Sequence, residues 1–411
     1  MDTQQQQLDF NALAILAGQL FTPASPIRER DLFSGRADQI RRVIDVIFQT
    51  GQHVIIFGER GVGKTSLANV LSSFASNPSK PSPFLSTRIN CDRADSFETV
   101  WEKVFDGMQL IKQKSMLGFN QPSQQVSFAA KDIFKGVKIT PNEVRKAIIG
   151  VSASFLPVII IDEFDRLPIS IRKLFADLIK SLSDDVVNAT IILIGVGDSV
   201  EELISEHQSV SRSLVQVQMP RMNIDEIKDI LSRTTSRLGM SIDQNVLQHM
   251  AKLSKGLPHY AHLLGLHATR NALDNQSLVI KGDNFEKAII QSLEDAQYSI
   301  KTDYHNAIRS AHKDNLFSDV LLACALAPLD DMGEFAAQEL RPPLQQITSK
   351  FYDIPSYARH LTEFSEDKRG NILIKSGEKR SYRYKFADPL MQPYVTMQGL
   401  IDKKITTQSL S

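Results

Sequence analysis

Five short segments of the chain have the pattern of strands, and helix-like segments lie between them. Residues 54–57 and 157–161 are uninterrupted apolar runs, which indicate central strands buried on both faces. The other predicted strands are residues 84–91, 191–194 and 214–219. Strands that alternate with helices favour an α/β fold built on a parallel sheet.

Other segments depart from this alternation. Residues 8–20 predict a short helix, and the apolar spacing in residues 96–111 predicts another. The polar residues 112–140 look like an insertion between core elements, either a partner contact or an idle surface loop. Residues 222–296 predict a run of three helices.

The last hundred residues have a different pattern. Three helices are predicted, at 315–327, 343–352 and 356–364, followed by strands at 372–375 and 382–386. This is the element order of a winged helix. On the third of these helices Leu361 and Phe364 should face inward, and Arg359, His360 and Glu363 outward.

Bulk properties narrow the function classes. The 411 residues are enough for two or three domains, and no apolar run approaches the length of a membrane span. The first residues lack a secretory signal, and two cysteines form no ligand cluster, so we expect a cytoplasmic protein, or a nucleoid or nuclear one if it associates with DNA. The net charge of zero excludes a globally basic nucleic-acid binder.

The segment after the first strand has the pattern GxxxxGK[ST] between a strand and a helix. Glycines let backbone N–H groups approach phosphate oxygens, and the helix N-terminus adds positive charge. Lys64 would contact the β- and γ-phosphates of ATP, and the Thr65 hydroxyl would bind Mg²⁺. The predicted nucleotide-binding residues are Gly58, Glu59, Arg60, Gly61, Val62, Gly63, Lys64, Thr65 and Ser66.

Two carboxylates follow the apolar run 157–161. Asp162 would hold the Mg²⁺ ion, and Glu163 would orient the attacking water. An acid directly after the metal-binding aspartate indicates hydrolysis as well as binding.

The wing of this predicted winged helix, residues 368–385, carries a local charge excess. Residues 368–385 contain seven basic residues and one acid, a net charge of +6. This pattern fits contact with a DNA backbone, although winged helices also bind proteins and charge runs are often only solvated. The predicted nucleic-acid contacts are Arg359, His360, Lys379, Arg380 and Arg383.

Taken together, GERGVGKT, IIIDE and the strand that ends in a polar tip resemble the core of AAA+ ATPases. The segment YKFADPL, at residues 384–390, resembles the end of winged helices that are attached to certain ATPases. These are ATPases of the origin-recognition and archaeal initiator type and the related signal-transduction ATPases with numerous domains. The resemblance implies a P-loop NTPase sheet sandwiched by helices, then an all-α lid, then a winged helix. The implied domains are residues 1–31 (tail and linker helix), 32–221 (ATPase core), 222–300 (lid), 301–399 (winged helix) and 400–411 (tail).

The resemblance also assigns four further residues. Arg36 would pack near the adenine, and Asp198 would sense the γ-phosphate. Arg212 matches the arginine finger that reaches the nucleotide of a neighbouring subunit, although an ordinary surface arginine is the alternative. His259 stands where the family lid carries an arginine on the γ-phosphate.

These residues imply ATP and Mg²⁺ as ligands, ATP hydrolysis, and a homo-oligomer or AAA+ neighbour that receives Arg212. Two uses of the cycle remain open. The first is a DNA-associated regulator that contacts double-stranded DNA through the basic wing. The second is a signalling or antiviral-defence ATPase whose ATP-driven assembly controls a separate effector protein, with the winged helix used for protein contact.

Overall fold

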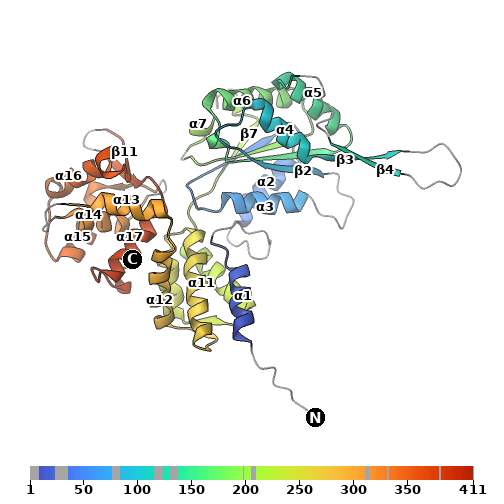
Figure 1. Cartoon of the computed structure of the whole chain (residues 1–411). Coiled ribbons are helices and arrows are strands. Elements are labelled where there is room, and N and C mark those ends of the chain that lie inside the picture. Colours follow the sequence, from blue (N-terminus) through green and yellow to red (C-terminus); the bar gives the residue numbers. More distant parts are fainter. Residues whose placement is uncertain are drawn as a thin grey trace, which may run out of the picture. The chain divides into compact units, whose positions relative to one another are not determined.

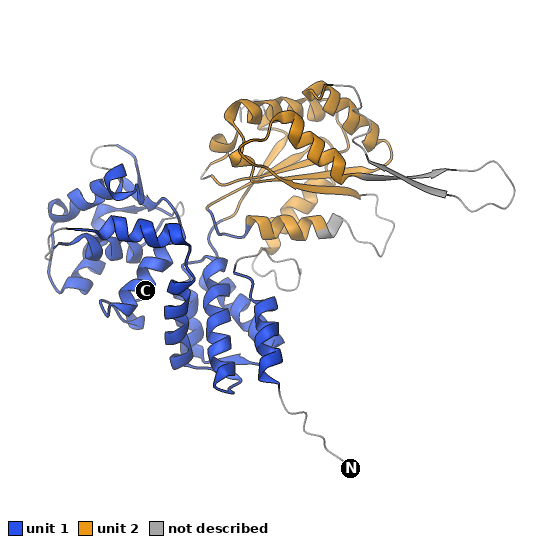
Figure 2. Ribbon diagram, in the orientation of Figure 1, with its two compact units in different colours: residues 1–26, 60–63, 220–411 blue, residues 27–59, 64–219 orange. Residues whose placement is uncertain are grey.

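The computed structural model describes residues 9–23, 36–75, 84–114, 124–129, 138–197, 199–204, 210–310, 315–330, 333–378 and 381–410. The chain divides into two compact units, shown in Figure 2. Unit 1 comprises residues 1–26, 60–63 and 220–411, and unit 2 comprises residues 27–59 and 64–219. Each is described separately.

Unit 2 is built on a parallel five-stranded sheet in the order β2-β5-β6-β1-β7. The strands are β1 (His53–Phe57), β2 (Phe84–Asn90), β5 (Leu156–Asp162), β6 (Thr190–Ile194) and β7 (Leu214–Gln218). All five residues of β1 are buried, as are those of β6, because these strands are central and covered on both faces. The five strands predicted from the sequence are confirmed.

Helices cover both faces of this sheet (Figure 1). One face carries α2 (Ala37–Ile47) and α3 (Lys64–Ala75); the other carries α4 (Phe97–Gly107), α5 (Pro141–Ser152) and α6 (Ile169–Asp184). A short helix, α7 (Val200–Leu203), follows β6. The aromatic rings of Trp101, Phe105 and Phe175 pack together in the core beside α4, where all three are fully buried.

The predicted insertion contains regular structure. Strands β3 (Gln109–Lys114) and β4 (Gln124–Ala129) pair antiparallel as a hairpin. The sequence prediction of a helix through residue 111 is therefore wrong in its last turn, because α4 ends at Gly107 and Met108 is extended. Glycine ends helices readily.

Unit 1 begins with α1 (Phe10–Leu20), capped by the Asp9 side chain. This helix packs on the long helix α11 (Pro258–Asp274), beside α9 (Ile224–Arg237), α10 (Gln244–Leu253) and α12 (Gly282–Glu294). Two-residue strands β8 (Ser241–Ile242), after α9, and β9 (Val279–Ile280), after α11, pair in parallel. Phe21 is fully buried against α11, where a Cβ atom on Gly265 would lie 2.3 Å from its ring. The first helix is thus part of the bundle and not a free linker.

The rest of unit 1 carries helices and a three-stranded antiparallel sheet in the order β10-β12-β11. The elements in chain order are α13 (Tyr298–Ile308), α14 (Phe317–Leu326), β10 (Phe335–Ala336), α15 (Arg341–Thr348), α16 (Ile354–Phe364), β11 (Leu373–Ser376), β12 (Arg383–Phe386) and α17 (Met391–Ile401). From α14 to β12 this is the element order of winged-helix domains. Among the described residues, no helix is both long and apolar enough to cross a bilayer.

Candidate functional site

The phosphate loop joins β1 to α3 through three glycines with positive φ angles, at positions 58, 61 and 63. At Gly58 both conformation and space require glycine, because φ is 149° and a Cβ atom would lie 2.4 Å from the Met219 carbonyl oxygen. Helix α3 begins at Lys64, so its free N–H groups and dipole are available at the end of the loop. The sequence-predicted loop therefore has the backbone of an anion site.

Lys64 is held inside this loop. Its Nζ atom donates hydrogen bonds to the carbonyl oxygens of Gly58 (2.8 Å) and Glu59 (2.7 Å). The side chain is buried, and this desolvation lowers the pKa of Lys64 to about 8, although the nearby carboxylates Asp165 and Asp162 act in the opposite direction. The ammonium group can exchange these carbonyl contacts for phosphate oxygens.

Asp162 closes β5 and is almost fully buried. Its Oδ1 atom accepts the Glu163 backbone N–H at 2.9 Å, and its Oδ2 atom lies 2.8 Å from Nη2 of Arg88. Both carboxylate oxygens are therefore fixed by protein groups.

Glu163 follows in the left-handed region, with φ 57°. This uncommon conformation for a non-glycine residue turns the chain sharply at the end of the strand. Its carboxylate pairs with Arg166 at 3.0 Å, and desolvation raises the pKa of Glu163. A half-exposed carboxylate at a strand end can orient a water molecule.

Two charged residues near Asp162 were missed in the sequence. Arg88 on β2 interrupts a strand otherwise without charge, and that interruption was the available signal. Asp165 is the second acid after β5, and its Oδ1 atom accepts the backbone N–H of Val196, just past β6, at 2.8 Å. Asp165 thus ties the segment after β5 to the tip of β6.

The donor chemistry fits magnesium. Asp162 and Thr65 offer a carboxylate and a hydroxyl, the hard oxygen ligands that Mg²⁺ prefers. Among the described residues, no group of three or more His, Cys, Asp or Glu side chains could hold a metal ion by itself. Because Mg²⁺ in nucleotide sites takes most ligands from phosphates and water, one carboxylate and one hydroxyl are sufficient protein ligands.

The other residues predicted from the sequence differ in their exposure to solvent. Arg36 is buried at the N-terminus of α2 within unit 2, and its predicted contact with adenine stays a prediction. Asp198 lies outside the described residues. Arg212 lies just before β7 and is exposed, as an arginine finger would require. Its backbone oxygen accepts a hydrogen bond from Nε2 of Gln52 at 3.2 Å.

His259 lies in unit 1 at the start of α11. Its Nδ1 atom is 2.8 Å from the carbonyl oxygen of Pro23, and burial lowers the pKa of the ring. The imidazole is therefore neutral near pH 7 and bonded to the N-terminal segment. A phosphate contact by His259 stays a prediction.

The predicted nucleic-acid contacts are only partly free. Arg359 is exposed and pairs with Glu363 at 2.7 Å, whereas the ring of His360 packs on Phe317 with centroids 4.6 Å apart. Arg383 pairs with Asp330. Lys379 and Arg380 lie outside the described residues.

The net charge of +6 counted along the wing overstates the free charge. Arg369 is buried, stacks 3.6 Å over Phe317 and donates to the Ala307 carbonyl oxygen at 3.0 Å. The prediction that Glu363 faces outward is wrong: it is buried because it pairs with both Arg369 and Arg359.

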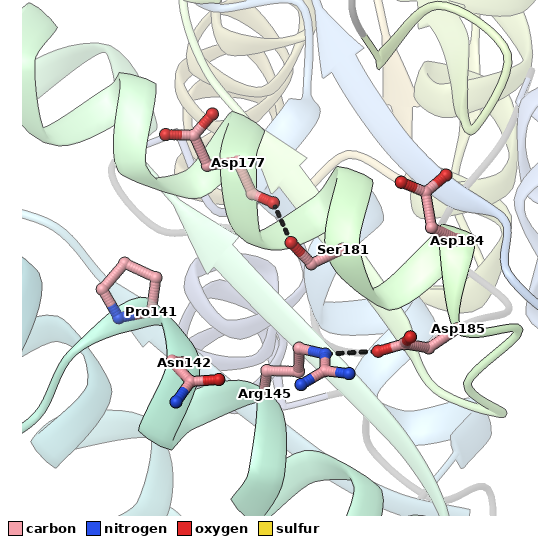
Figure 3. Close-up of a pocket in the computed structure, with 7 residues that line it drawn as sticks. All are labelled: Pro141, Asn142, Arg145, Asp177, Ser181, Asp184 and Asp185. Atoms are coloured by element: carbon pink, nitrogen blue, oxygen red, sulfur yellow. Dashed lines mark hydrogen bonds and ion pairs between the residues drawn. The ribbon is translucent and has the colours of Figure 1, made fainter.

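A surface hollow lies between α5 and α6 of unit 2 (Figure 3). It is lined by Pro141, Asn142, Arg145, Asp177, Ser181, Asp184 and Asp185. Arg145 pairs with Asp185 across it. The hollow contains none of the candidate site residues.

Comparison with known proteins agrees with this site. A family model described as an AAA domain matches residues 46–204, which include the phosphate loop, Asp162 and Glu163. No curated protein matches the chain.

Solved structures match nearly the whole chain. The ORC2 protein of Aeropyrum pernix, solved as ADPNP–ADP complexes, has 14% identity and a TM-score of 0.51, with 94% of this chain and 98% of that chain covered. A Walker-type ATPase of Pyrococcus abyssi has 17% identity and a TM-score of 0.49, with 92% and 99% covered. At these identities the likeness concerns the fold. Residues 46–204 are therefore an AAA domain, and the chain shares the fold of the Aeropyrum pernix ORC2 protein.

Proposed function

We propose that the chain is an ATP-driven switch that assembles with neighbouring subunits and regulates a process on DNA. The observation that carries the nucleotide part is the position of Lys64. Its buried ammonium lies in a glycine loop, close enough to Asp162 and Asp165 for their charges to raise its pKa against the effect of burial. A triphosphate would replace the loop carbonyls as the partner of this ammonium.

The remaining roles follow from chemistry. Mg²⁺ would neutralise charge on the β- and γ-phosphates, and Thr65 and Asp162 would hold it. Glu163 would accept a hydrogen bond from the attacking water, since its carboxylate is only half-buried and lies beside Asp162. Asp198 and His259 would complete the γ-phosphate contacts, and Arg36 would lie near the base.

Assembly is proposed from Arg212. Its side chain is exposed, and a free guanidinium can stabilise the transferred phosphoryl group of a neighbouring subunit by a factor of about 10³–10⁵. Because ATP supplies the charge that this arginine would contact, ATP should favour the oligomer over the monomer.

Mass photometry tests this assembly. Glu163→Gln should keep ATP bound, so this variant should form larger species with Mg-ATP than without nucleotide. Adding Arg212→Ala should lower their abundance, whereas the control Arg93→Ala, another exposed arginine of unit 2, should not. An unchanged monomer in the ATP-loaded variant would contradict the role of Arg212 between subunits.

Contact with double-stranded DNA is proposed from exposed basic residues in and around the wing. Arg359 and Lys368 are exposed, and Lys379 and Arg380 extend the basic run in the sequence. Salt-dependent anisotropy with a labelled duplex would test it. Replacing Arg359 and Lys368 with alanine should weaken binding and reduce the dependence on salt.

A second function is favoured by the paired arginines. Since Arg369 and Arg383 are engaged within unit 1, the wing has less free charge for a phosphate backbone. In a signalling or antiviral-defence ATPase the same domain would bind a separate effector protein. ATP-dependent assembly, together with a duplex affinity that does not change when the basic residues are replaced, would favour this alternative.

A further inference from the structure

Arg88 links three elements around Asp162 in unit 2. On β2, the register places Asn90 opposite Asp162, and Arg88 lies two residues earlier, so both point to the same face of the sheet. Nη2 of Arg88 is 2.8 Å from Oδ2 of Asp162, and Nη1 donates to the Asn69 side chain on α3. Asn69 is four residues after Thr65, on the same face of this helix one turn further on.

The burial of this pair gives it weight. Only 3% of the Asp162 side chain and 18% of the Arg88 side chain are exposed to solvent. A carboxylate this far from water needs a compensating charge, and a pair with this little solvent is weakly screened. The other Asp162 oxygen accepts the uncharged backbone N–H of Glu163. Arg88 is therefore the cation in direct contact with Asp162, and the buried ammonium of Lys64 is a second positive charge nearby.

We propose that Arg88 is a positioning residue that makes metal binding at Asp162 depend on nucleotide. While the guanidinium holds Oδ2, Asp162 presents little net charge, and a divalent cation would also meet a positive neighbour. The negative charge of a triphosphate offsets that repulsion, so metal and nucleotide bind together. This inference rests on the proposed nucleotide site.

The test uses the full chain and Mn²⁺ as the probe, with free Mn²⁺ measured by electron paramagnetic resonance. Wild-type protein should bind Mn²⁺ weakly alone and tightly with ADP. Arg88→Met removes the charge but keeps much of the volume, and it should bind Mn²⁺ without nucleotide about 10–100-fold more tightly, the range that residues around metal ligands typically control. Arg88→Lys should behave like wild type.

Two controls assign the effect to Asp162. Adding Asp162→Asn to Arg88→Met should abolish the gain in Mn²⁺ affinity. Arg145→Met breaks another arginine–aspartate pair of the same unit and should leave Mn²⁺ binding unchanged.

A folded Arg88→Met protein with wild-type Mn²⁺ affinity would overturn the proposal. Should this variant not fold, Arg88→Gln, whose amide can still donate to Asp162, gives the same comparison; failure of both to fold would make Arg88 structural and also overturn it. If wild-type protein bound no ADP at all, the proposed function would fail. ADP binding with Mn²⁺ affinity independent of Arg88 would reject this inference alone.

Discussion

The carboxylate of Asp388 lies 3.2 Å from the guanidinium of Arg60, although 328 positions separate them. Arg60 is at the tip of the phosphate loop, and residues 60–63 belong to unit 1 together with residues 220–411. Next to this pair, a Cβ atom on Gly61 would lie 3.2 Å from the Leu390 side chain. The tip of the loop is thus held by the segment between β12 and α17.

The burial of Leu390 should contribute more stability than this ion pair. The side chains of Arg60 and Asp388 are 55% and 25% exposed, and such pairs contribute about 0–1 kcal/mol. Asp388→Asn should therefore lower the free energy of unfolding by less than about 1 kcal/mol. Leu390 is buried, so Leu390→Ala should cost about 2–5 kcal/mol. Urea denaturation of both variants measures the difference, and equal losses would show that this ranking is wrong.

The first helix should be essential to the stability of unit 1. Phe21 is fully buried against α11, and the next residue, Thr22, donates its backbone N–H to Nδ1 of His262 at 3.3 Å. Phe21→Ala should cost about 3–5 kcal/mol, because the cavity is lined by close-packed helices. Phe48→Ala, which truncates a ring that is 63% exposed, is the matched control and should cost much less. Thermal unfolding measures both variants. Equal melting temperatures would show that docking of the first helix does not stabilise unit 1.

Acid should destabilise the sheet through His53. Its Nδ1 atom accepts the backbone N–H of Ile191 at 3.0 Å, and burial lowers the pKa of the ring from 6.5 to about 3. The unfolded chain therefore binds a proton between these values that the folded chain does not. The contribution of His53 to the free energy of unfolding is therefore fully present above pH 6.5. Below pH 6.5 it falls by up to about 1.4 kcal/mol per pH unit.

His53→Gln measures this contribution, because glutamine has a similar size and a side-chain oxygen that can accept a hydrogen bond, but it does not titrate. The free energy of unfolding, measured by urea from about pH 7 to pH 5, should depend less on pH in this variant. His305→Gln, on an exposed histidine, is the control. An identical pH dependence in wild type and His53→Gln would refute the assignment. His262, whose pKa burial lowers to about 4, acts in the same direction and remains in both proteins.

Releasing Arg383 should strengthen DNA binding if the wing contacts phosphates. Asp330→Asn removes the nearer of two carboxylates that pair with Arg383, the other being Glu334 at 4.0 Å, while its side-chain oxygen can still accept the Glu334 N–H. We expect a few-fold higher affinity for the duplex. The slope of log affinity against log salt concentration should become steeper by about one. Asp319→Asn, which adds the same charge beside Lys404, is the control. No change for Asp330→Asn would favour the protein-binding alternative.

The sequence predicts best what depends on local pattern. The strands β1 and β5 and the loop between β1 and α3 follow from apolar runs and glycine spacing, because each is determined by adjacent residues. The register that brings Arg88 to Asp162 depends on pairing between β2 and β5, 74 positions apart along the chain, which no local pattern encodes. Asp165 was missed for the same reason, since its partner Val196 lies on another strand tip.

Charge was the least predictable property. A sum along residues 368–385 treats every side chain as solvated, whereas the fold buries Arg369 against the ring of Phe317 and pairs Arg383 with Asp330. The hairpin of β3 and β4 was also not foreseen, because most residues of β3 are polar and its two apolar residues, Leu110 and Ile111, are adjacent and do not alternate.

Nucleotide binding through Lys64 is the claim on which the whole account depends. Its direct measurement is titration of a fluorescent ATP analogue in magnesium buffer, with wild type, Lys64→Ala and the control Lys180→Ala, an exposed lysine of α6. We predict saturable binding by wild type and Lys180→Ala, and a loss on the order of 100-fold for Lys64→Ala, which removes the ammonium that would contact the phosphates. Equal affinity of Lys64→Ala and wild type, or no binding by either, would contradict it.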